Sequence, residues 1–242
     1  EIPVDDEDFE ALVPMADRVI LDSRKFEDLA EGLRLVPRFC PHDSVTCTVT
    51  DLSWMSLQPW RELAAQHFDP PHSRRYLANI ERIDVSFARG EREGAPPSSP
   101  LLLAAWFMGR TGTETRSVEH VNNDALLVRA RQDDHAVEVH LSPTGRGLAP
   151  GSVGALVVRG NVGGQRGTFI VKSVSMTGVV VTEECPGVCL PPQELELPPL
   201  PEAVLAAQAM GSPGRDEIYE ETLATAVDIM TTLGGSSGRV EV

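Results

Sequence analysis

The chain has 242 residues, enough for one large domain or two small ones with a hydrophobic core. Its 36 acidic residues outnumber 21 Lys and Arg and give a net charge of −15, which argues against binding to nucleic acid or to an anionic membrane. Four cysteines are too few for a disulfide-stapled secreted scaffold, and no apolar run approaches the roughly 20 residues that span a bilayer. The acidic start also lacks the features of a signal peptide, so we expect a soluble, cytoplasmic protein.

Residues 1–50 have the pattern of a helix, a strand and a second helix. Apolar spacing predicts a helix around residues 5–13, a strand at 18–22 and a helix at 26–36 that Pro37 ends. Because the chain does not begin with Met, we expect it to be a processed or excised fragment.

The next helix is the most informative one. Apolar residues recur at helical spacing from Leu57 to Phe68, Ser56 can cap the helix, and Asp69-Pro-Pro71 ends it. Residues 80–87 then alternate as a half-buried strand, and residues 90–99 form a loop.

A second helix opens at Ser99-Pro100. It continues through Leu101–Met108 without a polar face, so we expect Trp106 and Phe107 to be among the most buried side chains.

From residue 125 to residue 182 the pattern changes to alternating strands joined by short turns. Residues 185–201 are rich in proline and glutamate and are expected to run over the surface, and a closing helix is expected over 215–230. The fold class is therefore α+β, a largely antiparallel sheet with helices packed on it. We expect one domain over residues 51–233 and a flexible tail over 234–242.

Chemistry-bearing motifs are scarce. The glycine-rich run Gly160–Gly167 lies between two expected strands, so a hairpin loop is favoured over a phosphate-binding loop, which needs a helix after it. Neither a Walker motif nor a nucleophile elbow occurs, and the six histidines are scattered without metal-ligand spacing. We expect no catalytic site, no metal and no cofactor.

The cysteines form two near pairs, Cys40/Cys47 and Cys185/Cys189. Each pair could be idle thiols or a reversible disulfide, and all four could bind one zinc ion. The short turn Cys185-Pro-Gly-Val-Cys189 makes that pair the candidate redox site.

The segment Asp51-Leu-Ser-Trp54-Met-Ser-Leu-Gln-Pro59-Trp60-Arg61 resembles the glucose-6-phosphate dehydrogenase assembly protein family, OpcA, in its C-terminal portion. The resemblance continues through residues 80–87 and 101–109 and the closing segment Asp216–Leu223, whereas 183–201 match nothing in the family pattern. Members of the family are longer, so the resemblance implies that residues 1–50 are the C-terminal part of a longer N-terminal region. The chain therefore resembles a non-catalytic bacterial protein that assembles or allosterically activates glucose-6-phosphate dehydrogenase, which opens the oxidative pentose phosphate pathway and supplies NADPH.

Trp54 and Arg61 are the candidate partner-binding residues, because tryptophan and arginine are frequent interface hot spots. Trp60 lies on the apolar stripe and is expected to be core, an interpretation that also stays open for Trp54. Two other classes of function remain as alternatives: a thiol-based redox-sensing module and a sugar-phosphate-binding enzyme domain.

Overall fold

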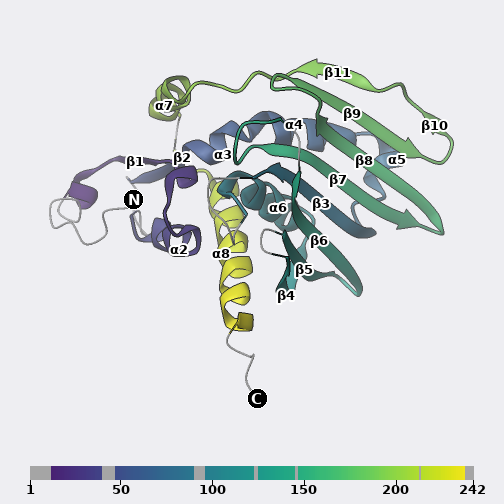
Figure 1. Ribbon diagram of the computed structural model, residues 1–242, viewed down its shortest axis with the longest axis horizontal. Coiled ribbons are helices and arrows are strands. Elements are labelled where there is room, and N and C mark those ends of the chain that lie inside the picture. Colours follow the sequence, from purple (N-terminus) through teal and green to yellow (C-terminus); the bar gives the residue numbers. More distant parts are fainter. Residues whose placement is uncertain are drawn as a thin grey trace.

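The computed structural model describes residues 12–39, 47–89, 96–122, 125–144, 147–212 and 214–237. Within these residues it contains a nine-stranded sheet and a separate two-stranded sheet. Figure 1 shows the helices gathered beside the large sheet rather than alternating on its two faces. The expected α+β class with a largely antiparallel sheet is confirmed.

The described strands are β1 (Arg18–Leu21), β2 (Thr48–Asp51), β3 (Ile80–Ala88), β4 (Thr113–Asn122), β5 (Ala125–Gln132), β6 (His135–Thr144), β7 (Val153–Val162), β8 (Gln165–Ser173), β9 (Gly178–Cys185), β10 (Val188–Cys189) and β11 (Gln193–Glu196). The described helices are α2 (Leu29–Phe39), α3 (Leu52–Ser56), α4 (Gln58–His67), α5 (Pro71–Arg74), α6 (Ser98–Arg110), α7 (Glu202–Gly211) and α8 (Glu217–Ser237), with short 3-10 turns η1 (Val13–Met15) and η2 (Ser23–Lys25).

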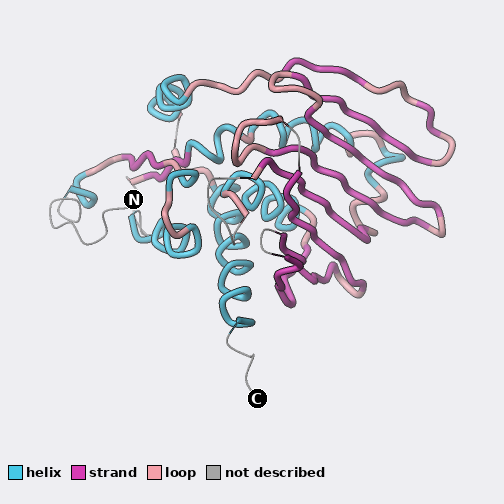
Figure 2. The backbone as a smooth tube through the Cα atoms, viewed as in Figure 1, coloured by secondary structure: helices cyan, strands magenta, loops and turns pink. Residues whose placement is uncertain are grey.

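The large sheet has the strand order β10-β9-β8-β7-β3-β6-β5-β4, and β11 also pairs with β9. All its neighbours are antiparallel except β3 and β6, which run parallel because α6, β4 and β5 intervene between them in the chain. Figure 2 shows how the long hairpins fan out from the helical part of the molecule. The expected strands between residues 125 and 182 are confirmed, whereas β4 was not expected.

The core lies between the large sheet and the helices α4, α6 and α8. Inward residues of the strands alternate with residues on the opposite face, as a half-covered sheet requires. Leu101, Leu102 and Leu103 of α6 are fully buried, and Phe107 is 3% exposed, as expected. Trp106 differs from the expectation: it is only partly buried, because it packs at the margin of the core.

Several helix boundaries differ from those expected from the sequence. Pro37 lies inside α2, near its end, where its missing N–H removes only one helical hydrogen bond, so the helix continues to Phe39. The helix expected from Leu57 to Phe68 is α4, but Ser56 does not cap it: Ser56 ends a preceding helix, α3, which was not expected. The closing helix α8 extends to Ser237, beyond the expected end of the domain.

The first part of the described chain shares the core of the rest. Strand β1 pairs with β2 in parallel, and Phe26, Leu33 and Val36 belong to the same buried cluster as α6 and α8. The helix expected at 5–13 lies mostly outside the described residues. None of the described helices is long and apolar enough to cross a membrane.

Candidate functional site

Asp51 sits at the junction of three parts of the chain. Its carboxylate Oδ1 accepts hydrogen bonds from the backbone N–H of Ser53 (2.9 Å) and of Ser23 (3.1 Å), so it caps the N-terminus of α3 and holds η2 beside it. Its Oδ2 accepts a hydrogen bond from the hydroxyl of Tyr219 in α8 at 3.3 Å. One side chain therefore ties α3, η2 and α8 together.

Burial dominates the electrostatics of this carboxyl group. Asp51 is 0% exposed, and burial raises the pKa of Asp51 from 3.8 to about 6, although the hydrogen bonds from Ser23 and Ser53 oppose the rise. Burial also raises the pKa of Tyr219 well above its ordinary value, with Asp51 as the next cause. The pair is buried, and its hydrogen bonds hold η2, α3 and α8 together.

Trp54 is fixed from two sides. Its indole Nε1 donates a hydrogen bond to Oδ2 of Asp216 at 2.7 Å, and its ring lies 5.7 Å from the ring of Tyr219. Oδ1 of Asp216 in turn accepts a hydrogen bond from the backbone N–H of Tyr219, in the first turn of α8. With 2% of its surface exposed, Trp54 lies in the core beneath Arg61, and its role in partner binding stays a prediction.

Arg61 covers the face of Trp54. The carbon of its guanidinium group lies 3.5 Å from the centroid of the ring, the geometry of a cation–π contact. Its Nε is buried without a hydrogen-bond partner. Burial lowers the pKa of Arg61 to about 10, with Asp216 and Glu62 opposing the change, so the group stays charged at neutral pH. Asp216 thus binds the indole nitrogen of Trp54, and the charged, half-buried Arg61 lies on the face of the same ring.

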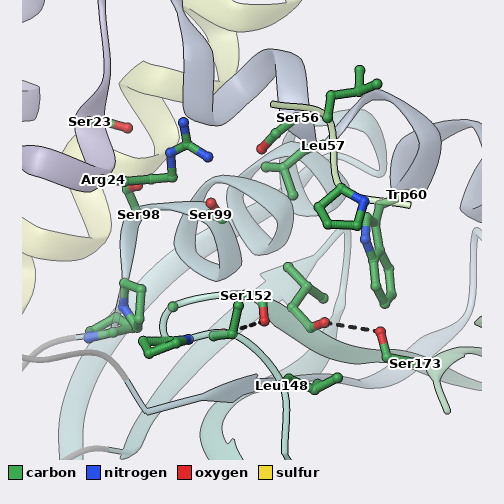
Figure 3. Close-up of a pocket in the computed structure, with 18 of the residues that line it drawn as sticks. Ser23, Arg24, Ser56, Leu57, Trp60, Ser98, Ser99, Leu148, Ser152 and Ser173 are labelled. Carbon is green, nitrogen blue, oxygen red and sulfur yellow. Dashed lines mark hydrogen bonds between the residues drawn. The ribbon is translucent and has the colours of Figure 1, made fainter. Parts of the chain in front are cut away.

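A pocket of about 710 Å³ lies next to this segment, between η2, α4, the start of α6 and β8 (Figure 3). Its most frequent polar group is the serine hydroxyl. The hydroxyls of Ser98 and Ser99 are hydrogen-bonded to that of Ser53 at 3.0 and 2.9 Å, and Ser173 donates to a backbone carbonyl. Arg24 is held by two hydrogen bonds to the carboxylate of Asp22. Most polar groups of the pocket are thus already hydrogen-bonded to other residues of the chain.

The candidate redox cysteines lie on one tight hairpin but not together. Cys185 pairs with Val188 and Cys189 pairs with Glu184, so their side chains point to opposite faces of the β9–β10 ladder. Both thiols are free, Cys185 is buried and Cys189 is exposed. Burial, with Glu183 next, raises the pKa of Cys185 to about 12. A disulfide between them would require the hairpin to rearrange, and the redox role stays a prediction. Cys40 lies outside the described residues.

We expect the two thiols to react at very different rates. At pH 8 Cys189 should be alkylated by iodoacetamide within minutes, whereas Cys185 should stay unmodified until the protein unfolds, because the thiolate is the nucleophile. Peptide mass spectrometry with and without denaturant measures this. Equal labelling of both in the native protein would contradict the described burial of Cys185.

The glycine-rich run and the histidines have structural roles in the described part of the chain. The run Gly160–Gly167 is the β7–β8 hairpin, whose turn residues Gly163 and Gly164 have φ of +60° and +83°. No group of three or more His, Cys, Asp or Glu side chains among the described residues could hold a metal ion. His72 instead contacts the buried carboxylate of Glu183 at 3.0 Å, which joins α5 to β9.

A family model for the C-terminal domain of a glucose-6-phosphate dehydrogenase subunit, OpcA, matches residues 47–223. The chain belongs to the OpcA family. It is 31% identical over 226 residues to a protein of Synechococcus elongatus whose name, OpcA, assigns it to the OxPP cycle, covering 89% of this chain and 48% of that protein. An OpcA protein of Nostoc punctiforme is 26% identical, covering 91% of this chain and 48% of the relative. This OpcA-family chain therefore spans about half the length of the curated relatives that it matches.

Solved structures with a similar fold are more distant in sequence. A mutant of the 3-ketoreductase KijD10 from Actinomadura kijaniata has a TM-score of 0.53 and 13% identity, covering 90% of this chain and 69% of that one. The transcriptional regulator Gal80p from Kluyveromyces lactis has a TM-score of 0.53 and 9% identity, covering 92% and 65%. Since one of these is an enzyme and the other is a regulator, the likeness shows the fold alone.

Proposed function

We propose that this OpcA-family chain is a non-catalytic assembly factor and allosteric activator of glucose-6-phosphate dehydrogenase in the oxidative pentose phosphate pathway. The observation that carries the proposal is the family match over residues 47–223, in a family described as a subunit of that dehydrogenase. The names of the relatives from Synechococcus elongatus and Nostoc punctiforme, which refer to the OxPP cycle, support the same pathway. We expect the protein to act in the cytoplasm.

The site supports a binding role through Arg61. A charged, half-buried guanidinium that lies on an indole is ready to bind a carboxylate of a partner. The ring beneath it is fixed by Asp216, so little rotational freedom is lost on binding. Trp54 then contributes by positioning Arg61.

Activation would follow from a shift between forms of the dehydrogenase. A partner that binds the active oligomer more tightly than the inactive form moves the equilibrium toward the active one. Moving a 1:99 mixture to 99:1 requires a preference of about 5.5 kcal/mol. A standard interface of roughly 1,600 Å² can supply that preference.

The test measures the cognate dehydrogenase with and without this protein. The chain alone should show no turnover of glucose 6-phosphate with NADP, and its addition should raise dehydrogenase activity at limiting substrate. Arg61→Ala should weaken this effect by at least about tenfold in half-saturating concentration, the size expected of an interface hot spot. Arg110→Ala is the matched control, because Arg110 is an exposed arginine at the end of α6 whose ion pair is with Glu221 on the surface.

Two results would count against the proposal in different ways. An unchanged activity with wild-type protein would contradict the proposed function. Activation that Arg61→Ala and Arg110→Ala leave equally intact, in variants with wild-type circular dichroism, would move the contact surface away from Arg61. The segment from Glu183 to Pro201 would be the next surface to test.

A further inference from the structure

One face of the large sheet carries no helix in the part of the chain that the structure describes. The inward side chains, such as Val85, Val158 and Phe169, are buried against the helices α4, α6 and α8. Because side chains alternate along a strand, their neighbours point to the other face. Figure 1 shows β7, β8, β9 and β11 side by side at the margin of this sheet, away from α8.

The charges on this open face are sorted into two stripes. Directly paired residues on neighbouring strands point to the same face of the sheet, so the strand registers show which residues lie on the open face. These residues are Ala155, Val157, Arg159 and Asn161 on β7, Arg166, Thr168, Ile170 and Lys172 on β8, Val180, Thr182 and Glu184 on β9, and Glu194 and Glu196 on β11. The charged residues on β7 and β8 are all basic, and those on β9 and β11 are all acidic. The two stripes touch, because β9 pairs with β8 on one side and with β11 on the other.

Most of these charges form no ion pair within the described residues. Arg159 forms an ion pair with Asp84, but no ion pair joins any of the other five to another described residue: Arg166, Lys172, Glu184, Glu194 and Glu196. A basic stripe is also unexpected on a chain with a net charge of −15. The two stripes therefore carry complementary charge that is not used within one copy.

An apolar patch lies within the basic stripe, next to the acidic one. Val157 and Ile170 are direct partners across β7 and β8, and both are half-buried on the open face. Val180 lies on β9, two strands away from β7, beside Lys172. An apolar centre flanked by charges is the usual composition of a protein–protein interface.

We propose that this open face is the contact surface of a homodimer, with a two-fold axis parallel to the strands between β8 and β9. Such an axis places the basic stripe of each copy over the acidic stripe of the other, so that both contacts are attractive. Two sheets that pack face to face in this way lie about 10 Å apart with their strands within about 30°. A second copy is the occupant that this pattern fits, because one chain carries both complementary stripes. The inference does not depend on the proposed function.

A charge swap tests the pairing. One variant, Arg166→Glu with Lys172→Glu, makes both stripes acidic, and a second, Glu184→Lys with Glu194→Lys, reverses the acidic stripe. In sedimentation velocity at low salt we expect the wild type to be a dimer and each variant alone to dimerise at least tenfold more weakly. An equimolar mixture of the two variants should restore the dimer, because each acidic stripe then faces a basic one. Raising the salt to about 0.5 M should weaken the wild-type dimer.

The control reverses two exposed arginines elsewhere, Arg38→Glu with Arg110→Glu, and should leave the dimer unchanged. These substitutions are on the surface, so circular dichroism should be that of the wild type for all variants. A wild type that stays monomeric, or a mixture that fails to restore the dimer, would overturn the proposal. If the wild type is monomeric and the Arg166→Glu, Lys172→Glu variant no longer binds the dehydrogenase, the homodimer proposal is also overturned. The open face would then be the contact surface for that enzyme.

Discussion

Replacement of Trp54 by alanine is expected to lower the free energy of unfolding by about 3–5 kcal/mol. The substitution removes a ring that is 2% exposed, the hydrogen bond that Nε1 donates to Asp216, and the surface on which Arg61 lies. Urea denaturation should therefore show a large fall in the midpoint with little change in slope.

A conservative variant separates the ring from its hydrogen bond. Trp54→Phe keeps most of the aromatic packing but leaves the Asp216 carboxylate without its indole donor, so we expect a loss of about 1–2 kcal/mol. A loss below about 1 kcal/mol for Trp54→Ala would contradict the described packing. Because Trp54→Ala is expected to destabilise the fold, Arg61→Ala is the better probe of partner binding.

The stability of the protein is also expected to depend on pH through Asp51. Its pKa is about 6 when folded and 3.8 as its ordinary value, so folding favours the neutral form. This contribution is fully present below about pH 4 and is lost as pH rises through 6. The difference between these two pKa values corresponds to a change of about 3 kcal/mol in the free energy of unfolding between low pH and neutral pH.

Asp51→Asn isolates this contribution, because asparagine is close in shape and does not titrate in this range. Relative to the variant, the wild type should gain up to about 3 kcal/mol in unfolding free energy as pH falls from 7 to about 4. Urea denaturation of both proteins across this range gives the difference directly. Parallel pH profiles would show that the carboxyl group does not change its protonation on folding.

The parts of the fold that could be predicted depend on repeating patterns. The alternation over 125–182 and the continuous apolar helix at α6 are local signals, and both were confirmed. The parallel pairing of β3 with β6 has no local signal, because it joins strands more than fifty residues apart. Trp106 was misjudged for a related reason: a helix without a polar face can still lie at the margin of a core.

The candidate site was predicted in part. The motif identified Trp54 and Arg61, but it did not reveal that one covers the other, since Asp216 and Tyr219 reach them from the far end of the chain. The expected cap was wrong, because α4 begins without a side-chain cap, and the preceding helix α3 was not expected. Asp51 follows a strand and precedes an apolar run, which is a recognisable N-cap signal, whereas Ser56 bonds back to the carbonyl of Ser53.

We propose that this OpcA-family chain binds glucose-6-phosphate dehydrogenase and changes its assembly. Sedimentation velocity of the cognate dehydrogenase, with increasing amounts of this chain, tests it most directly. We expect the dehydrogenase boundary to move to a larger sedimentation coefficient and the chain to co-sediment with it at a fixed ratio. Two boundaries that sediment independently at every ratio, with the chain folded and in excess, would contradict it.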